Sequence, residues 1–169
     1  MWDQFLSSYF IQDGIGLAIL GAMCAVGFGV WGSSVGIRIA SAHSAGIISE
    51  KPLSFTPCLI LTALPGTQGF YGFICGIYIA MRIGLMSSAE VASQIRPFEG
   101  VSLLFIGLLV GVMEYKNAVN MGMACASSIN LVGKRPEEFG RSILFPALIE
   151  TYAVVALLMG VLMVTWVTA

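Results

Sequence analysis

The chain has 169 residues, of which 57% are hydrophobic and only 10% are charged, and its formal net charge is −1. A soluble domain carries roughly 25% charged residues, so this sequence has too little polar surface to cover a globule in water. These numbers exclude a soluble enzyme, a disordered segment and a nucleic-acid-binding domain with a basic face. The lipid bilayer is therefore the expected solvent.

Long apolar stretches divide the chain into four parts. Each is longer than the ~20 residues that cross the hydrocarbon core as a helix. The stretches cover residues 14–48, 53–85, 98–131 and 138–168. Pro52, Pro97 and Pro136 fit the first turn of the helix that follows, where a missing N–H costs nothing. The sequence predicts an all-α membrane protein with four transmembrane helices.

Signals for export, disulfides and metal binding are weak. The first ten residues, MWDQFLSSYF, contain no basic residue, so we expect no secretory signal there. His43 has no cysteine or carboxylate at ligand spacing, and we interpret it as an ordinary residue near a helix end. The cysteines form no C-x-x-C pair and are interpreted as buried packing residues. They are Cys24, Cys58, Cys75 and Cys125.

The distribution of basic residues predicts an orientation. The short connections at 47–54 and 132–141 hold Lys51, Lys134, Arg135 and Arg141. The longer connection at 85–100 is flanked by Arg82 and holds Arg96, balanced by Glu90 and Glu99. The positive-inside rule then favours cytoplasmic short loops and both termini outside, with Trp2 and Trp166 at the outer interface.

The two halves of the chain align without a gap when the sequence is shifted by 84 positions. Lys51-Pro52 then falls on Arg135-Pro136, and Thr67 falls on Thr151. This register predicts two duplicated helical hairpins of like orientation, covering residues 1–90 and 91–169.

Small residues are dense along the first helix, and Gly32 and Gly36 form a G-x-x-x-G step. Such a step lets helix backbones approach closely in lipid. The pattern is typical either of general membrane helix packing or of a crowded inner layer where neighbouring copies of a chain meet.

Two acidic residues, Glu114 and Glu150, lie deep within the third and fourth stretches. An ionisable group at mid-helix costs roughly 2.5–3.5 kcal/mol, so each is a functional candidate. The alternative is a protonated glutamate that only bonds a neighbouring helix. In the 84-residue register Glu150 aligns with Gly66 and Glu114 with Val30, so the first hairpin has no equivalent carboxylate.

The second helix offers polar partners for these carboxylates. Leu64, Thr67, Gln68 and Tyr71 follow the i, i+3, i+4, i+7 spacing of one helical face. Pro65 removes a backbone N–H and distorts the turn around it. Polar oxygens and irregular carbonyls at membrane depth suit a hard cation, although single polar residues also join helices to one another.

These residues carry a resemblance to a known family. LPGTQGFYGF at 64–73 and IETYA at 149–153 resemble the two signature segments of the proteolipid subunit, K or c, of bacterial V-type (V/A-type) rotary ATPases. The glycine-rich first helix and GVMEYK, which ends at Lys116, agree with it. The resemblance implies a homo-oligomeric ring in lipid that rotates against a stator subunit bearing a basic residue. It also implies central-stalk subunits on the cytoplasmic loops, ATP hydrolysis elsewhere in the complex and no catalytic site in this chain.

The resemblance also implies roles for individual residues. Glu150 matches the essential ion-binding carboxylate, and Thr67 and Gln68 match sodium ligands of the sodium-pumping members. Leu64 matches the backbone-carbonyl ligand, and Tyr71 matches the phenol that hydrogen-bonds the carboxylate. The remaining ligand in sodium-type relatives is a glutamine on the third helix, where this chain has Glu114.

Two carboxylates beside one Na⁺ leave a net negative charge at membrane depth, which is costly. Either one of them stays protonated, or the site takes two cations, or it carries protons alone. We favour Na⁺, because Thr67 and Gln68 would have little purpose in a proton-only site. A small dimeric antiporter with a membrane glutamate and a structural membrane scaffold are the alternatives from other functional classes.

Overall fold

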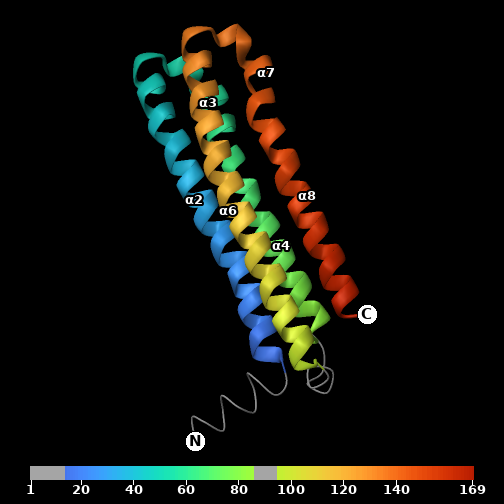
Figure 1. Ribbon diagram of the computed structural model, residues 1–169. Helices are drawn as coiled ribbons and strands as arrows, with labels where there is room; N and C mark the ends of the chain where they lie inside the picture. The colour runs from blue at the N-terminus through green and yellow to red at the C-terminus, as the bar shows by residue number, and fades with distance from the viewer. Residues whose placement is uncertain (1–13, 86–94) are drawn as a thin grey trace, which may run out of the picture.

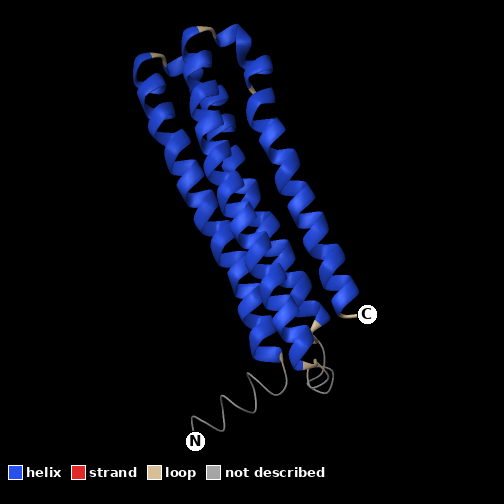
Figure 2. Cartoon of the chain, in the orientation of Figure 1, coloured by secondary structure: helices blue, strands red, loops and turns tan. Residues whose placement is uncertain are grey.

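The computed structural model describes residues 14–85 and 95–169, and all regular structure in those ranges is helical (Figure 2). Short 3₁₀ segments interrupt or begin several of the helices. In chain order the elements are α2 (Ile15–Glu50), η2 (Pro52–Ser54), α3 (Phe55–Ala63), η3 (Leu64–Gly66), α4 (Thr67–Arg82), α6 (Pro97–Lys134), η4 (Pro136–Glu138), α7 (Phe139–Ser142) and α8 (Leu144–Val167).

These elements form four helices that are long and apolar enough to cross a membrane, as the sequence predicts. They cover Ile15–Glu50, Pro52–Arg82, Pro97–Lys134 and Pro136–Val167. The second ends three residues before the predicted end at 85, because residues 83–85 form a turn in which Gly84 has a φ of 80°. A positive φ is readily adopted by glycine, and this turn ends the helix.

The spans form two hairpins that lie side by side. Figure 1 shows the α2–α3 and α6–α7 turns at one end of the bundle and the carboxyl end of α8 at the other. The α2 and α6 helices run in the same direction and form the most extensive contact of the bundle, while α8 packs on α6 and α4. Lys51 joins the two hairpin turns, because its Nζ donates to the carbonyl of Gly133 at 2.5 Å.

Glycines allow α2 and α6 to pack backbone against backbone. A methyl group built at Gly32 would lie 2.5 Å from Cα of Tyr115, and one at Gly36 would overlap the carbonyl of Ala118. The G-x-x-x-G step of the first helix therefore lies at a close contact within the chain. Three further glycine pairs bring the two backbones together along the bundle: Gly14 with Gly100, Gly21 with Gly107, and Gly36 with Gly122.

Hydrogen bonds recur in both hairpins at the spacing found in the sequence. Ser44 Oγ donates to the Cys58 carbonyl at 3.4 Å, and 84 residues later Ser128 Oγ donates to the Ser142 carbonyl at 2.8 Å. Two further pairs follow the same spacing: Thr67 to Leu64 with Thr151 to Leu148, and Lys51 to Ile47 with Arg135 to Leu131. The duplication thus extends from the sequence to individual contacts.

The fourth span contains a break that the sequence analysis does not predict. The helix is interrupted at Ile143, between α7 and α8. Pro146 has no N–H to offer the carbonyl of Ser142 four residues earlier, and the Ser128 hydroxyl donates to that carbonyl instead. A tertiary hydrogen bond thus replaces a missing helical one.

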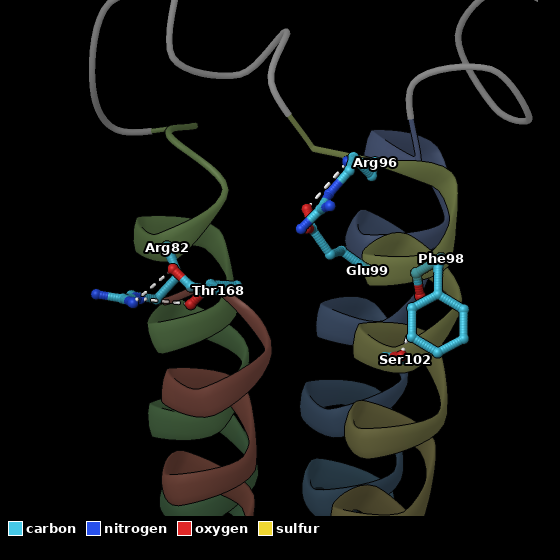
Figure 3. Close-up of polar contacts among 6 residues, drawn as sticks. All are labelled: Arg82, Arg96, Phe98, Glu99, Ser102 and Thr168. Atoms are coloured by element: carbon cyan, nitrogen blue, oxygen red, sulfur yellow. Dashed lines mark hydrogen bonds and ion pairs between the residues drawn. The ribbon is translucent and has the colours of Figure 1, made fainter.

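Two arginines make polar contacts at the other end of the bundle (Figure 3). Arg82 at the end of α4 donates from Nε to Thr168 Oγ1 at 2.7 Å and from Nη2 to the Thr168 carbonyl at 2.9 Å. Arg96 precedes α6 and pairs with Glu99 at 2.6 Å. Trp166 is exposed near this end, whereas Trp2 and Glu90, named in the predicted orientation, lie outside the described residues.

Candidate ion-binding site

The second span is broken at the predicted position. Leu64, Pro65 and Gly66 form the 3₁₀ turn η3 between α3 and α4. The Leu64 carbonyl accepts both the N–H of Thr67 and its hydroxyl, the latter at 3.0 Å. Two of the predicted oxygen ligands, from Leu64 and Thr67, are therefore neighbours at one turn.

Ser33, on α2, holds this turn from the side. Its Oγ accepts a hydrogen bond from the N–H of Gly69 at 2.7 Å and donates to the carbonyl of Gly66 at 3.4 Å. The first N–H groups of a helix lack partners within it, and the residue before α4 makes no side-chain cap. Ser33 supplies that cap from another helix. The sequence analysis missed it, although a hydroxyl among the glycines of α2 could have drawn attention to it.

Tyr71 and Glu150 join the two hairpins. Tyr71 Oη on α4 donates to Glu150 Oε1 on α8 at 2.7 Å, which is a short, charge-assisted distance if the carboxylate is ionised. This is the hydrogen bond that the family resemblance implies. Both side chains remain partly exposed on the single chain.

Gln68 is fully buried and makes no hydrogen bond to the other predicted ligands. Its Nε2 donates to Sδ of Met121 at 3.4 Å, and its Oε1 has no partner among the described residues. Met121 is a contact that the sequence analysis missed. A thioether is a weak acceptor, so this contact is easily exchanged for a better one.

Glu114 is also fully buried, and neither of its carboxylate oxygens has a hydrogen-bond partner in the described part of the chain. Buried polar atoms are normally hydrogen-bonded, so the two unpartnered oxygens of Glu114 require an explanation. Within residues 14–85 and 95–169, the other buried side-chain atoms without partners are Gln68 Oε1 and Asn117 Nδ2. All of them belong to α4 and α6, close in sequence to the predicted site.

Other metal-binding chemistry is not assembled in the ranges that the structure covers, where no group of three His, Cys, Asp or Glu side chains could hold a metal ion. The four cysteines are free, and Cys58, Cys75 and Cys125 are buried. His43 lies within α2 rather than at its end, and its Nδ1 is 3.2 Å from the amide Nδ2 of Asn130.

Comparison with known proteins agrees with this geometry. The profile of the family formed by the C subunit of ATP synthase matches the chain twice, at residues 20–79 and 104–163. The chain belongs to the ATP synthase C-subunit family. The two matched ranges are offset by 84 residues, the same spacing at which the sequence and the hydrogen bonds repeat.

Two curated relatives indicate which proteins of this family the chain resembles. The chain is 33% identical over 155 residues to the V-type sodium ATPase subunit K of Enterococcus hirae, covering 90% of this chain and 93% of that protein. It is 31% identical over 155 residues to the A-type ATP synthase subunit K of Methanocaldococcus jannaschii, covering 92% of this chain and 64% of that protein.

Members of this family that resemble the chain so closely are ring-forming proteolipids of V- and A-type rotary ATPases. They are membrane components of an ion-transporting complex and are not themselves catalytic. The predicted family, the duplicated four-helix fold and the rotor-ring role are confirmed, and the antiporter and scaffold alternatives lose their support.

Proposed function

We propose that each copy of the chain carries one Na⁺ across the membrane, bound at Glu150 as the ring turns. The remaining ligands are the Leu64 carbonyl, the Thr67 hydroxyl, the Gln68 amide oxygen and Glu114. The observation that carries the proposal is the Tyr71–Glu150 hydrogen bond of 2.7 Å, because it brings the carboxylate to the helix that bears the neutral oxygens. Hard cations such as Na⁺ prefer oxygen ligands of this type.

Two small side-chain movements would form the site. The Thr67 hydroxyl donates to the Leu64 carbonyl, and rotation of that hydroxyl hydrogen would free the hydroxyl oxygen and the second lone pair of the carbonyl, which also accepts the Thr67 N–H. Gln68 would give up its weak bond to Met121 and turn its unpartnered Oε1 toward the ion. The name of the Enterococcus hirae relative, a V-type sodium ATPase subunit, also supports Na⁺.

Glu114 must then be neutral. Two ionised carboxylates around one Na⁺ would leave a net negative charge in the membrane, and close like charges disfavour the second ionisation. Glu114 is the one we expect to keep its proton, because it is fully buried without a hydrogen-bond donor among the described residues, whereas Glu150 has the Tyr71 hydroxyl. A protonated Glu114 still offers a carbonyl oxygen as a ligand.

A proton-only ring is the second candidate. The observation that favours it is that Gln68 bonds Met121 and Thr67 bonds Leu64, and neither polar side chain is hydrogen-bonded to Glu150. In that case the ion is a proton on Glu150, and Tyr71 alone positions the carboxyl group.

Transport follows from the charge of Glu150. With its ion bound, the carboxylate is neutralised and can pass lipid without exposing a charge. At the stator, a basic side chain of the partner subunit would displace the ion and pair with the carboxylate. The central stalk would dock on the two hairpin turns, which carry Lys51 and Arg135, on the cytoplasmic side, with both termini outside.

Carbodiimide labelling of the assembled complex in membranes tests the proposal, since the reagent attacks only a protonated buried carboxyl group. We expect an adduct on Glu150, distinguished by mass spectrometry from any adduct on the protonated Glu114, and protection of Glu150 by Na⁺ across a range of pH, with K⁺ at equal ionic strength as the control. Labelling of Glu150 without Na⁺ protection at any pH would establish the proton-only ring. An adduct confined to another residue would contradict the assignment of Glu150.

A further inference from the structure

Lys51 links the two hairpins of one chain at their turns. It directly follows α2, and its Nζ donates a hydrogen bond to the Gly133 carbonyl near the end of α6. That carbonyl accepts no backbone N–H among the described residues, as is usual for the last carbonyls of a helix. The Lys51 ammonium therefore caps the carboxyl end of the neighbouring helix.

Arg135 holds the same position in the second hairpin, 84 residues later. The backbone angles φ and ψ are −133° and 81° at Lys51, and −138° and 87° at Arg135. Each of the two N–H groups bonds the carbonyl four residues earlier at 2.8 Å, and each residue is followed by a 3₁₀ turn that begins with proline. The two side chains therefore leave their turns in equivalent directions.

Unlike Lys51, Arg135 has no partner within its own chain. Its side chain is exposed, and its guanidinium makes no hydrogen bond or ion pair in the described part of the chain. The nearby Arg141, by contrast, pairs with Glu138 at 3.2 Å. The chain has no third hairpin beyond α6 among these residues, so the group that Arg135 would cap must come from another molecule.

The free faces of α2 and α6 are suited to a second copy of the chain. In a ring of identical chains, the second hairpin of one copy lies beside the first hairpin of the next. Gly21 of α2 contacts α6, and its equivalent Phe105 is 57% exposed. Gly107 of α6 contacts α2, and its equivalent Met23 is 66% exposed. The α2–α6 contact can therefore repeat between copies, with α6 of one copy against α2 of the next.

The contact between copies is wider than the contact within a chain. Phe105 and Met23 are larger than the glycines at the equivalent positions, so the two helices must stand further apart. Arginine is longer than lysine, and its planar guanidinium offers five N–H donors. The longer of the two basic side chains thus stands where the wider gap has to be crossed.

The end of α2 offers acceptors for such a cation. Ser49 is the equivalent of Gly133, and its carbonyl accepts no backbone N–H within residues 14–85 and 95–169. Glu50 follows it, and both residues are exposed. The carboxyl end of a helix and a carboxylate each favour a positive charge.

The charges on the two sides are complementary. Within one chain, a groove between the ends of α2 and α6 is lined by Ile47, Glu50, Lys51, Asn130, Gly133 and Lys134. Shifted by 84 residues, the equivalent groove between copies has Lys134 and Arg135 on one side and Glu50 of the next copy on the other. Two cations then face a carboxylate and the end of a helix.

We propose that the Arg135 guanidinium of one copy donates hydrogen bonds to the Ser49 carbonyl and the Glu50 carboxylate of the next copy in the ring. The inference rests on the ring that the family forms and not on the ion that the ring carries. Bonds from Lys51 within a chain and from Arg135 between chains then alternate around the ring of hairpin turns. Because an arginine binds a carboxylate in a defined geometry, Arg135 helps to orient each copy on its neighbour.

Cross-linking of cysteine pairs tests the contact in membranes that contain the assembled complex. The Ser49→Cys/Arg135→Cys variant, treated with a short bis-maleimide, should give a ladder of dimers and higher oligomers on SDS gels, because each link joins two copies. Lys51→Cys/Lys134→Cys is the matched control, since both residues line the groove within one chain, and it should keep the monomer mass. Each single-cysteine variant should also keep the monomer mass, which shows that the native cysteines do not contribute.

Ring stability tests the bond itself. Arg135→Ala should lower the temperature at which the ring dissociates in SDS by several degrees, and Glu50→Ala should lower it as well. The double variant should lose less than the sum of the two, because both changes remove one contact. Arg141→Ala is the control, because Arg141 pairs with Glu138 in its own chain, and its ring should dissociate like the wild-type ring. If Arg135→Ala forms no ring, Arg135→Lys keeps the charge on a shorter side chain and should dissociate below the wild-type temperature.

Only monomers from the Ser49→Cys/Arg135→Cys variant in intact rings would overturn the contact between these faces. Equal dissociation temperatures for Arg135→Ala and wild-type rings would overturn the hydrogen bonds, even where the cross-links form. Neither measurement depends on the transported ion. Both can therefore fail while Na⁺ still protects Glu150 from carbodiimide, so failure of this inference and failure of the proposed function are distinguishable.

Discussion

The two hairpins have the same arrangement of helices and turns, but they carry different polar groups. Each has a parallel long helix, a basic turn and a second span that begins with a 3₁₀ turn at a proline. In the first hairpin the second span is broken at Leu64–Gly66, which provides backbone and side-chain oxygens. In the second hairpin the equivalent segment is a continuous helix that carries Glu150. A neutral half and an acidic half thus meet at the Tyr71–Glu150 bond.

This division explains why the first hairpin needs no carboxylate. An additional ionisable group at the position of Gly66 would carry the cost of a second charge in the membrane. The Gly66 carbonyl there instead accepts a hydrogen bond from the Ser33 hydroxyl at 3.4 Å. Under the proposed function, the duplication supplies two equivalent positions and only one of them carries the ion-binding carboxylate.

The largest expected effect comes from the acidic half. Glu150→Gln removes the group that we propose to bind the ion, so ion transport coupled to ATP hydrolysis should be abolished while the ring still assembles. The matched change Glu114→Gln removes a carboxylate of the same type but leaves a neutral ligand, and it should retain transport. Uptake of ²²Na⁺ or pH-dye quenching in vesicles measures both. Equal loss in the two variants would contradict the separate roles assigned to them.

The close contact between the hairpins predicts the next effect. Gly36→Ala adds a methyl group that would meet the Ala118 carbonyl and lie 2.7 Å from Cβ of Pro65. Overpacking of this kind costs typically about 1–3 kcal/mol, so the ring should dissociate in SDS at a lower temperature. Asn120→Ala, at the equivalent position of the second hairpin, changes an exposed side chain and should leave the dissociation temperature unchanged. Equal stability of the two variants would show that the helices can separate at no cost.

Ser33 gives a smaller effect in the neutral half. Ser33→Ala removes the acceptor of the Gly69 N–H at the start of α4, and hydrogen bonds in membrane proteins contribute up to about 1.7 kcal/mol. We expect a loss of about 1.5 kcal/mol in ring stability, with a several-fold rise in the Na⁺ concentration that protects Glu150 if the site binds Na⁺. The control is Ser34→Ala, because the Ser34 hydroxyl bonds the Trp31 carbonyl on its own helix. Unchanged stability in Ser33→Ala would show that α4 does not depend on this cap.

The sequence was sufficient to predict the helices, because each span exceeds the bilayer thickness and the turns carry proline and basic residues. The irregular turn at Pro65 and the pairing of Tyr71 with Glu150 were also expected, from proline chemistry and from the family resemblance respectively. These features depend on local spacing or on short motifs, so each can be predicted from short stretches of sequence without knowing how the helices pack.

Contacts between distant segments could not be predicted in this way. Nothing in the spacing of the third helix indicates that Met121 accepts from Gln68 or that Ser33 caps α4, because both contacts depend on the rotation of one helix relative to another. The break at Ile143 was missed for a related reason. Pro146 was visible in the sequence, but its effect depends on how the carbonyl that it leaves free is satisfied.

We expect the smallest effect when the hydrogen bond to the Ser142 carbonyl is removed and compared with removal of its counterpart, the bond to the Cys58 carbonyl in the first hairpin. Ser128→Ala leaves the Ser142 carbonyl without the Ser128 hydroxyl, and Pro146 cannot replace it. Ser44→Ala removes the corresponding bond to Cys58, but residue 62 is a threonine with an N–H available to that carbonyl within α3. The average hydrogen bond between membrane helices is worth about 0.6 kcal/mol, so we expect Ser128→Ala to be the less stable variant by about that amount. Parallel SDS titrations of the two rings would measure the difference. Greater destabilisation by Ser44→Ala would mean that its 2.6 Å contact with the Thr62 hydroxyl, and not the carbonyl bond shared by the two hairpins, determines the stability of this turn.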